Sequence, residues 1–263
     1  MSETRKLAVI TGASSGIGLE LARISAAEGH DLIIASDTAE IAAASDQLRH
    51  LGTTVISVEA DLSTIEGVDQ LYDGVKQTGR PVDLLMANAG RGLGKGFIDQ
   101  HFDQISQVIA LNVVGTTYLL HRFLKDMAQR NAGRVLVTGS IGGILPGAFQ
   151  AVYNASKAYV NSLTFAIRNE LKDTDVTLTV LMPGPTETDF FETADLMDTK
   201  VGTDKKQPAA DVARIGYDAM MRGDDHEVAG FGNKLQALAA NLLPDTNLAE
   251  RHRKMAEPGS AHR

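Results

Sequence analysis

The chain has 263 residues, of which 33 are acidic and 25 basic, so its net charge is −8. Because it contains no cysteine, disulfides, thiolate catalysis and cysteine-ligated metals are excluded. The acidic balance disfavours a surface for nucleic acid or an anionic membrane, and the apolar run near the N-terminus is too short for a signal peptide or a membrane span. We therefore expect a soluble, cytoplasmic protein.

The first half of the chain alternates short apolar runs with amphipathic segments. The apolar runs predict strands, at residues 7–10, 32–35, 55–58 and 82–86. The amphipathic segments predict helices, at residues 18–29, 39–51 and 65–78. Such alternation predicts a parallel, doubly wound sheet, in which ligands bind beyond the carboxyl ends of the strands. Polar residues that follow different strands are therefore expected to converge on one edge.

The turn after the first predicted strand is rich in glycine. It reads TGASSGIG, residues 11–18, and it joins a buried strand to an amphipathic helix. Glycine lets the backbone bend tightly and approach a pyrophosphate, and the helix that follows offers free N–H groups and the positive end of its dipole. We interpret this turn as the phosphate-binding element of a dinucleotide site.

Asp37 follows the second predicted strand. A carboxylate there accepts hydrogen bonds from the ribose hydroxyls of a dinucleotide and repels a 2′-phosphate. No Arg or Lys lies at residues 12–18 or 36–38 to receive that phosphate. The pattern favours NAD(H), with NADP(H) as the second choice. The alternative interpretation is that Asp37 caps the N-terminus of the next helix.

The second half continues with longer helices. Helical periodicity covers residues 102–127, with the polar Asn112 in an apolar stretch. Further elements are predicted in chain order: a strand at 134–138, a helix ending at 171, a strand at 176–181, a helix at 209–222, a strand at 227–231, helices at 234–243 and 248–255, and a frayed tail at 257–263. The polar segment at 189–207 is interpreted as a substrate lid, and 233–256 as a C-terminal helical extension. Without repeats or an internal linker, residues 1–263 are predicted to form one domain.

Tyr153 and Lys157 are spaced i, i+4 on a predicted helix, so their side chains share a face. An ammonium beside a phenol favours the phenolate and lowers its pKa, which would let Tyr153 donate and accept a proton near neutral pH. Ser140, in the turn before this helix, offers a hydroxyl for a substrate oxygen. Taken alone, the pair also fits an ordinary contact on a helix surface.

Taken together, these motifs resemble the short-chain dehydrogenase/reductase family, in its compact branch. The matching residues are TGASSGIG at 11–18, Asp61, Asn88-Ala89-Gly90, Asn112, Ser140, Tyr153 with Lys157, and Pro183-Gly184 with Thr188. The resemblance implies a Rossmann-type, three-layer α/β/α fold with a mostly parallel, seven-stranded sheet. It also implies an oxidoreductase that uses a nicotinamide cofactor.

The resemblance further implies a catalytic tetrad of Asn112, Ser140, Tyr153 and Lys157. In this scheme Tyr153 exchanges a proton with the substrate oxygen, and Ser140 hydrogen-bonds the same oxygen. Lys157 holds the nicotinamide ribose and lowers the pKa of Tyr153. Asn112 is expected to position a water molecule that links Lys157 to solvent.

The cofactor-binding residues that the resemblance implies follow the ends of several strands. They are Gly12, Ser14, Ser15, Gly16, Ile17, Gly18, Asp37, Asp61, Leu62, Asn88, Ala89, Gly90, Tyr153, Lys157, Pro183, Gly184, Thr186 and Thr188. Two positions depart from the family pattern. Ala87 stands where the family often has Asn, and Ser36 stands where members that prefer NAD often carry their acid. Because Asp37 can still reach a ribose, NAD(H) stays favoured.

Two functions from different classes remain open. The first is an NAD-dependent oxidoreductase that acts on a secondary alcohol or ketone, as a homodimer or homotetramer paired through helices at 112–127 and 152–171. The second is a catalytically silent dinucleotide-binding sensor or scaffold. The expected substrate pocket is walled by residues 91–97, 141–150 and the lid, where Arg91 and Lys95 either meet an acidic substrate or are simply solvated. No nucleic acid, membrane or metal partner is expected, since the seven histidines show no ligand spacing.

Overall fold

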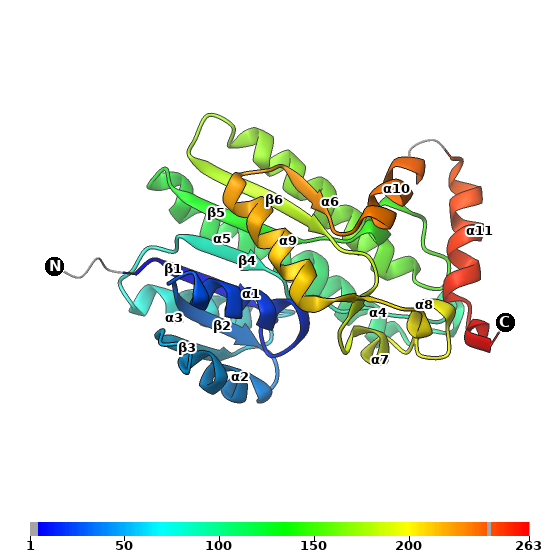
Figure 1. Ribbon diagram of the computed structural model, residues 1–263, viewed down its shortest axis with the longest axis horizontal. Coiled ribbons are helices and arrows are strands. Elements are labelled where there is room, and N and C mark those ends of the chain that lie inside the picture. Colours follow the sequence, from blue (N-terminus) through cyan, green and yellow to red (C-terminus); the bar gives the residue numbers. More distant parts are fainter. Residues whose placement is uncertain (1–4, 241–242, 263) are drawn as a thin grey trace.

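In the computed structural model, which describes residues 5–240 and 243–262, seven strands form one sheet with helices on both faces (Figure 1). The strands are parallel, in the spatial order β3-β2-β1-β4-β5-β6-β9. Their bounds are β1 (Leu7–Thr11), β2 (Asp31–Ser36), β3 (Val55–Glu59), β4 (Leu84–Ala87), β5 (Gly133–Thr138), β6 (Val176–Met182) and β9 (His226–Val228). The predicted Rossmann-type sheet is confirmed.

Both faces of the sheet are buried, which explains why its strands are apolar at consecutive positions. In β1, Leu7 and Val9 join the apolar cluster on one face, whereas Ala8 and Ile10 join the cluster on the other. The first face is covered by α3 (Ile65–Gln77), α5 (Thr116–Gln129) and α6 (Ala151–Glu170), and the second by α1 (Gly16–Ala27), α2 (Glu40–Arg49) and α9 (Ala209–Arg222). Each fully buried Leu or Ile side chain contributes about 1.5–3 kcal/mol.

The strand order reverses beside β1, and this reversal creates the place for a ligand. The chain builds β1, β2 and β3 outward in one direction and then returns to place β4 on the other side of β1. Ile10 of β1 therefore pairs with Ile34 of β2 on one side and with Met86 of β4 on the other. The helices that follow β1 and β4 leave on opposite faces, which opens a crevice at the carboxyl ends of these strands.

The predicted helical region 102–127 consists of three parts. These are α4 (Phe102–Ile109), a π-helical segment (Ala110–Gly115) and α5. A Cβ atom at Gly115 would overlap the carbonyl oxygen of Leu62, so glycine is required where this helix crosses the turn after β3. The widened turn carries Asn112, and π-helical segments of this kind often accompany functional sites.

The lid has a short secondary structure and an apolar cluster of its own. It contains α7 (Phe190–Thr193) and α8 (Lys200–Thr203), and its ends are tied by a small parallel pair, β7 (Thr186–Glu187) with β8 (Gln207–Pro208). Phe191, Ala194 and Leu196 form its buried core. The lid is therefore a packed unit and not a structureless loop, because these apolar side chains cover one another.

The C-terminal segment differs from its prediction in two ways. The last strand ends at Val228 instead of 231, since Gly230 adopts a φ of +93° and α10 (Phe231–Ala240) begins directly after it. The predicted frayed tail at 257–263 is wrong for the described residues, because Gly259 N donates to Asp198 Oδ2 at 3.1 Å and Lys200 N donates to Ser260 Oγ at 2.9 Å. These bonds hold residues 259–260 against the lid. The predicted helix at 234–243 runs partly over residues 241–242, outside the described residues.

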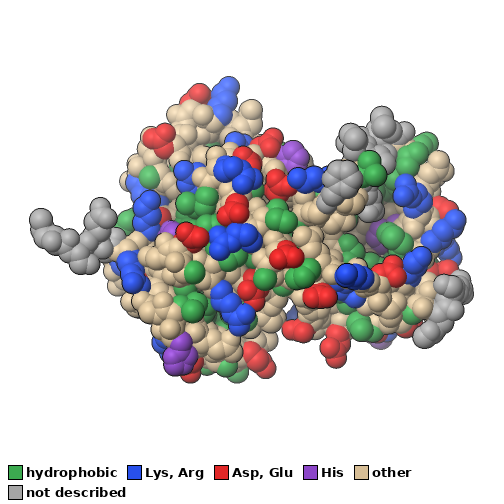
Figure 2. All heavy atoms as spheres, viewed as in Figure 1, with side chains coloured by type: hydrophobic (Ala, Val, Ile, Leu, Met, Phe, Trp, Pro, Cys, Tyr) green, Lys and Arg blue, Asp and Glu red, His purple; other side chains and the backbone are tan. Residues whose placement is uncertain are grey.

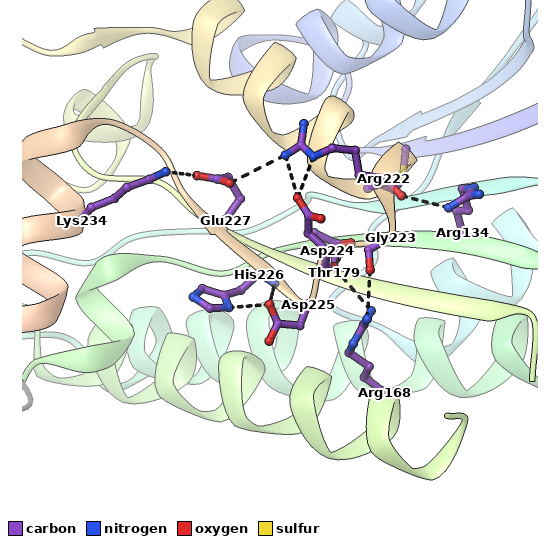
Figure 3. A network of polar contacts seen from close by, with 11 residues as sticks. Arg134, Arg168, Thr179, Arg222, Gly223, Asp224, Asp225, His226, Glu227 and Lys234 are labelled. Carbon is purple, nitrogen blue, oxygen red and sulfur yellow. Dashed lines mark hydrogen bonds and ion pairs between the residues drawn. The ribbon is translucent and has the colours of Figure 1, made fainter. Parts of the chain in front are cut away.

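α11 (Asp245–Ala256) and α10 gather with the lid helices at the end toward which the strands point (Figure 1). A polar network ties α10 to the sheet edge (Figure 3). Glu227 of β9 contacts Lys234 of α10 at 2.6 Å and Arg222 of α9 at 3.9 Å. Figure 2 shows acidic and basic side chains interspersed over one face of the molecule. None of the described helices is long and apolar enough to cross a membrane.

Candidate active site

A cavity of about 660 Å³ lies at the carboxyl ends of the strands. Its walls include every predicted catalytic and cofactor-binding residue except Gly18 and Asn112. Residues as distant in sequence as Gly12 and Thr188 therefore meet in one place, as expected at the switch point of a parallel sheet. The lid and α11 add further residues to the wall, among them Phe190, Phe191, Val201, His252 and Met255.

The glycine-rich turn between β1 and α1 forms one end of the cavity. Gly12 and Gly16 have φ values of +63° and +54°, in the left-handed region that favours glycine. A Cβ atom at Gly18 would overlap the carbonyl oxygen of Gly12, so Gly18 permits the close turn without lining the cavity. The N-cap residue of α1, Ser15, makes no side-chain cap hydrogen bond. The N–H groups of the first turn are therefore free to bind an anion such as a pyrophosphate.

Asp37 and Arg91 lie together beside this turn. Asp37 Oδ2 is 3.8 Å from Arg91 Nη2, and the two side chains are 45% and 44% exposed. Arg91 Nη1 also donates to Gln107 Oε1 at 2.7 Å. Of the two expectations for Arg91, contact with an acidic substrate or simple solvation, neither included this contact with Asp37; Arg91 lines the cavity with its guanidinium beside that carboxylate. The sequence near Asp37 gives no sign of this guanidinium, because Arg91 belongs to the loop after β4, more than 50 residues later.

Asn88 joins the ends of three strands. Its side-chain Nδ2 donates to Thr11 O at 3.2 Å, and its Oδ1 accepts from Thr138 Oγ1 at 3.0 Å. The backbone N–H groups of Asn88 and Ala89 both donate to Thr11 Oγ1 at 3.0 Å. These bonds hold β1, β4 and β5 at fixed positions around the cavity. Asn88 therefore shapes the site in addition to lining it.

Three other predicted cofactor-binding residues line the cavity, and their side chains form hydrogen bonds with the neighbouring backbone. Asp61 Oδ1 accepts from Ser63 N at 2.9 Å, in the turn after β3. Thr186 Oγ1 donates to Gly184 O at 2.9 Å, and Thr188 Oγ1 accepts from Phe190 N at 3.3 Å. The rigid turn after β6 is thus linked to the first residue of the lid helix α7.

Ser140, Tyr153 and Lys157 meet where the fifth strand gives way to α6. Ser140 is 7% exposed, and its Oγ accepts from Gly142 N at 2.9 Å. Lys157 is 5% exposed and donates from Nζ to Thr138 O at 2.7 Å, its hydrogen-bond partner among the described residues. Because an ammonium has three N–H donors, two remain for a ligand in the cavity.

The pKa values of this group differ from the expected pattern. Desolvation raises the pKa of Tyr153, and the interaction of its phenol with the Ser140 hydroxyl offsets only part of this rise. Burial also lowers the pKa of Lys157 to about 8. The predicted lowering of the Tyr153 pKa by Lys157 is therefore not observed. The physical reason is that burial disfavours the charged forms of both groups, phenolate and ammonium alike.

Asn112 lies outside the cavity wall and holds the loop after β4. Its Oδ1 accepts from Arg91 N and its Nδ2 donates to Arg91 O, both at 2.9 Å. The same Nδ2 donates to Ser156 Oγ of α6 at 2.9 Å. Asn112 thus connects the π-helical segment, the Arg91 loop and the helix that carries Tyr153. Its role in positioning a water molecule stays a prediction.

The lid packs directly against Tyr153. The ring centroids of Tyr153 and Phe190 are 5.1 Å apart, and Phe190 in turn packs on Phe191 at 5.4 Å. Residues 91–97 were predicted to wall the pocket; Arg91 does line the cavity, whereas the loop 92–96 supports the lid. Gly94 N donates to Ala194 O at 2.8 Å, and Lys95 forms an ion pair with Asp195. Lys95 is therefore a half-exposed surface residue paired with Asp195, in line with the solvated alternative, and it does not line the cavity.

Sequence reasoning did not identify His252 and Met255 of α11 as site residues. His252 is 7% exposed and lines the cavity, with its Nδ1 2.8 Å from Ala148 O, and Met255 lines the same wall. Burial lowers the pKa of His252, and the bond to the backbone carbonyl offsets part of this effect. α11 contains no recognisable motif, and it lies well after the last strand of the sheet in the sequence. The sequence therefore gives no indication that its side chains reach the cavity.

Comparison with known proteins identifies the family. The family model described as short chain dehydrogenase matches residues 6–198. An uncharacterized oxidoreductase of Staphylococcus aureus is 31% identical over 186 residues, which cover 70% of this chain and 80% of that protein.

Two solved structures are similar over almost the whole chain. A short-chain dehydrogenase/reductase from Burkholderia phymatum in complex with NAD is 26% identical, with a TM-score of 0.83 over 95% of this chain and 96% of that one. A short-chain dehydrogenase from Sphingobium yanoikuyae in complex with NADPH is 25% identical, with a TM-score of 0.80 over 90% and 93%. The chain thus belongs to the short-chain dehydrogenase family of nicotinamide-dependent oxidoreductases.

Proposed function

We propose that this protein interconverts secondary alcohols and ketones and prefers NAD(H). The observation that carries the proposal is that Ser140, Tyr153 and Lys157 line the same cavity as the glycine-rich turn. Acid–base groups and a helix N-terminus suited to an anion thus share one cavity. The similar structures that hold NAD or NADPH support a nicotinamide cofactor for this cavity.

The residues present fit such a cofactor. The uncapped N-terminus of α1 suits a pyrophosphate, and the Asp37 carboxylate suits ribose hydroxyls. Lys157 is a buried cation that has no carboxylate partner among the described residues, and its free N–H groups suit the hydroxyls of a second ribose. A bound nicotinamide dinucleotide would supply or accept the hydride.

The protein's own groups handle the proton and the charge on the substrate oxygen. In reduction, Tyr153 donates its phenolic proton to the carbonyl oxygen, and in oxidation it accepts the proton of the alcohol. The Ser140 hydroxyl donates a hydrogen bond to the same oxygen as negative charge develops there. Phe190, packed on the Tyr153 ring, keeps water from one side of the reacting atoms.

Replacing Tyr153 by Phe tests the mechanism. Tyr153→Phe removes the proton-exchanging hydroxyl and keeps the ring against Phe190, so kcat should fall by about 100-fold or more. The measurement follows NADH absorbance with a panel of secondary alcohols and ketones, and cofactor binding is titrated by fluorescence as a control for folding. Tyr159→Phe, which removes a half-exposed hydroxyl from the same helix, is the matched control. A Tyr153→Phe enzyme as fast as the parent would contradict the proposal, as would a parent that binds NADH but turns over nothing.

Cofactor preference forms a separate part of the proposal. The Asp37 carboxylate repels a 2′-phosphate, but the Arg91 guanidinium 3.8 Å away weakens that repulsion. We therefore expect NADH to bind more tightly than NADPH by about tenfold, which corresponds to roughly 1.4 kcal/mol. Asp37→Arg should reverse the order, whereas Asp46→Arg on the exposed side of α2 makes the same change in net charge and should not. Fluorescence titration of both cofactors decides, and tighter NADPH binding by the parent would refute the preference.

A further inference from the structure

The far end of the cavity from the glycine-rich turn is formed by the lid, the loop 141–150 and α11. Its wall is mostly apolar, with Leu145, Phe190, Phe191, Val201 and Met255. Three polar side chains of this wall are more than nine-tenths buried: His252, Gln150 and Asn154, whose Nδ2 donates to Leu145 O at 3.2 Å. None of them belongs to the acid–base group described above.

The hydrogen bond of His252 determines which ring nitrogen carries the proton. Nδ1 lies 2.8 Å from Ala148 O, and a carbonyl oxygen can only accept. Nδ1 is therefore protonated, and in the neutral imidazole Nε2 has a lone pair. Burial lowers the pKa of His252, which keeps the ring neutral at physiological pH. Nε2 has no hydrogen-bond partner among the described residues, so it is an acceptor available to a ligand in the cavity.

Gln150 lies two residues after the Ala148 carbonyl that binds His252. Its side chain is 6% exposed and makes no hydrogen bond to any other described residue. No amide atom of Gln150 is both fully buried and unpartnered, so its donor and acceptor are reached from the cavity and can pair there with a ligand or water. The cavity lining holds only two cations, Arg91 and Lys157, and Arg91 is paired with Asp37. The polar pair of His252 and Gln150 therefore suits a neutral group and not a carboxylate or phosphate.

We propose that His252 and Gln150 form a second polar subsite, which binds a neutral hydrogen-bond donor on the substrate away from the reacting carbon. His252 Nε2 accepts a hydrogen bond from this group, and the Gln150 amide supports it. The inference rests on the proposed function and narrows its substrate class to ketones and alcohols that carry a second hydroxyl on an apolar frame. The Nδ1 bond to Ala148 holds the acceptor in place.

Matched pairs of ketones test this inference. Each pair differs by one hydroxyl remote from the carbonyl, as in 4-hydroxycyclohexanone and cyclohexanone, and the panel extends to larger ring ketones. The parent enzyme should prefer the hydroxylated member by about tenfold in kcat/KM, the effect of one buried hydrogen bond. His252→Phe keeps a planar ring but removes the acceptor. It also removes the Nδ1 bond to Ala148 O, so the test is the ratio within each pair: kcat/KM for the hydroxylated member should fall about tenfold further than for the plain ketone, through KM.

Two further variants separate binding from structure. His252→Gln retains an acceptor near Nε2 and should keep part of the preference, whereas Met255→Leu alters only the apolar wall and should keep all of it. If His252 merely anchored α11, His252→Phe would lower kcat/KM for both members of a pair equally, and the inference would be overturned. Active enzyme without a preference would overturn it too and leave the proposed function standing. Failure to turn over any member of any pair would overturn both.

Discussion

Lys157 is a buried cation that donates a hydrogen bond to the carbonyl oxygen of Thr138 and has no carboxylate partner among the described residues. Its positive charge therefore destabilises the folded protein. A bound ribose would supply the missing acceptors, so the site is prepared for a cofactor at the expense of the protein's own stability. The same desolvation acts on Tyr153, whose raised pKa keeps the phenol protonated. A protonated phenol is the form required for reduction of a carbonyl group.

The depressed pKa of Lys157 predicts how stability depends on pH. The folded-state pKa is about 8 and the ordinary value is 10.5, so between these values the unfolded chain binds the proton that the folded chain has lost. The free energy of unfolding should therefore rise from pH 8 to pH 10.5, by at most about 3 kcal/mol from this group. Urea unfolding of the parent and of Lys157→Met at several pH values isolates the effect. A difference between the two proteins that does not change with pH would contradict it.

At the scale of elements, the lid and the loop 92–96 behave as one clamp over Tyr153. The Gly94–Ala194 hydrogen bond and the Lys95–Asp195 ion pair hold the two segments together. Lys95 and Asp195 have φ values of +71° and +57°, an unusual conformation for residues with side chains. Such a conformation persists when surrounding contacts compensate for it, and here both residues belong to the clamp.

Gly92 is the position at which this clamp can be tested. A Cβ atom there would overlap the Phe190 ring and lie 2.9 Å from Ala194 Cβ. Gly92→Ala should push Phe190 away from Tyr153 and lower kcat/KM by about tenfold to 100-fold, with cofactor affinity unchanged. Gly74→Ala is the control, since its Cβ atom would lie 3.8 Å from Val58 Cγ2 in ordinary contact. Steady-state kinetics of both variants give the measurement. Full activity of Gly92→Ala would show that catalysis does not depend on the packing of Phe190 against Tyr153.

At the scale of the whole molecule, α6 has an exposed face that is mostly apolar. Its exposed apolar residues are Ala155, Ala158, Tyr159, Phe165 and Ala166, with the exposed Ser162 between them. The neighbouring helix α5 lies alongside, because Thr117 Oγ1 is 3.1 Å from the Tyr159 hydroxyl. A second copy of the chain would cover this surface, which supports the proposal of a homodimer or homotetramer.

Ala158→Arg should break such an assembly. The residue is exposed at the centre of the face, so a long charged side chain is tolerated in a monomer but not in a close helix pair. Light scattering of the parent should give the mass of a dimer or tetramer, and Ala158→Arg should lower it. Ala42→Arg, at an exposed alanine of α2, is the matched control. If light scattering shows that the parent protein is a monomer, the proposed homodimer or homotetramer is wrong.

The fold and the cofactor edge were predictable because their signals are local in sequence. Apolar runs such as Leu7 to Ile10 predict strands buried on both faces, and their alternation with helices requires parallel strands whose carboxyl ends share an edge. The glycine-rich turn and the Tyr153–Lys157 spacing are likewise short motifs. They were found by their spacing, and the parallel sheet then brought them together in one cavity.

By itself, the sequence determined the order of the elements and the residues at the strand ends. Only the tertiary structure decided which distant residues join them: Arg91 beside Asp37, Phe190 on Tyr153, and His252 against Ala148. These pairs have no periodicity or fixed spacing, since they arise from loops and helices folded back over the sheet. The pKa values of Tyr153 and Lys157 also depended on the fold, because desolvation is set by everything packed around a group and not by its neighbours in the chain.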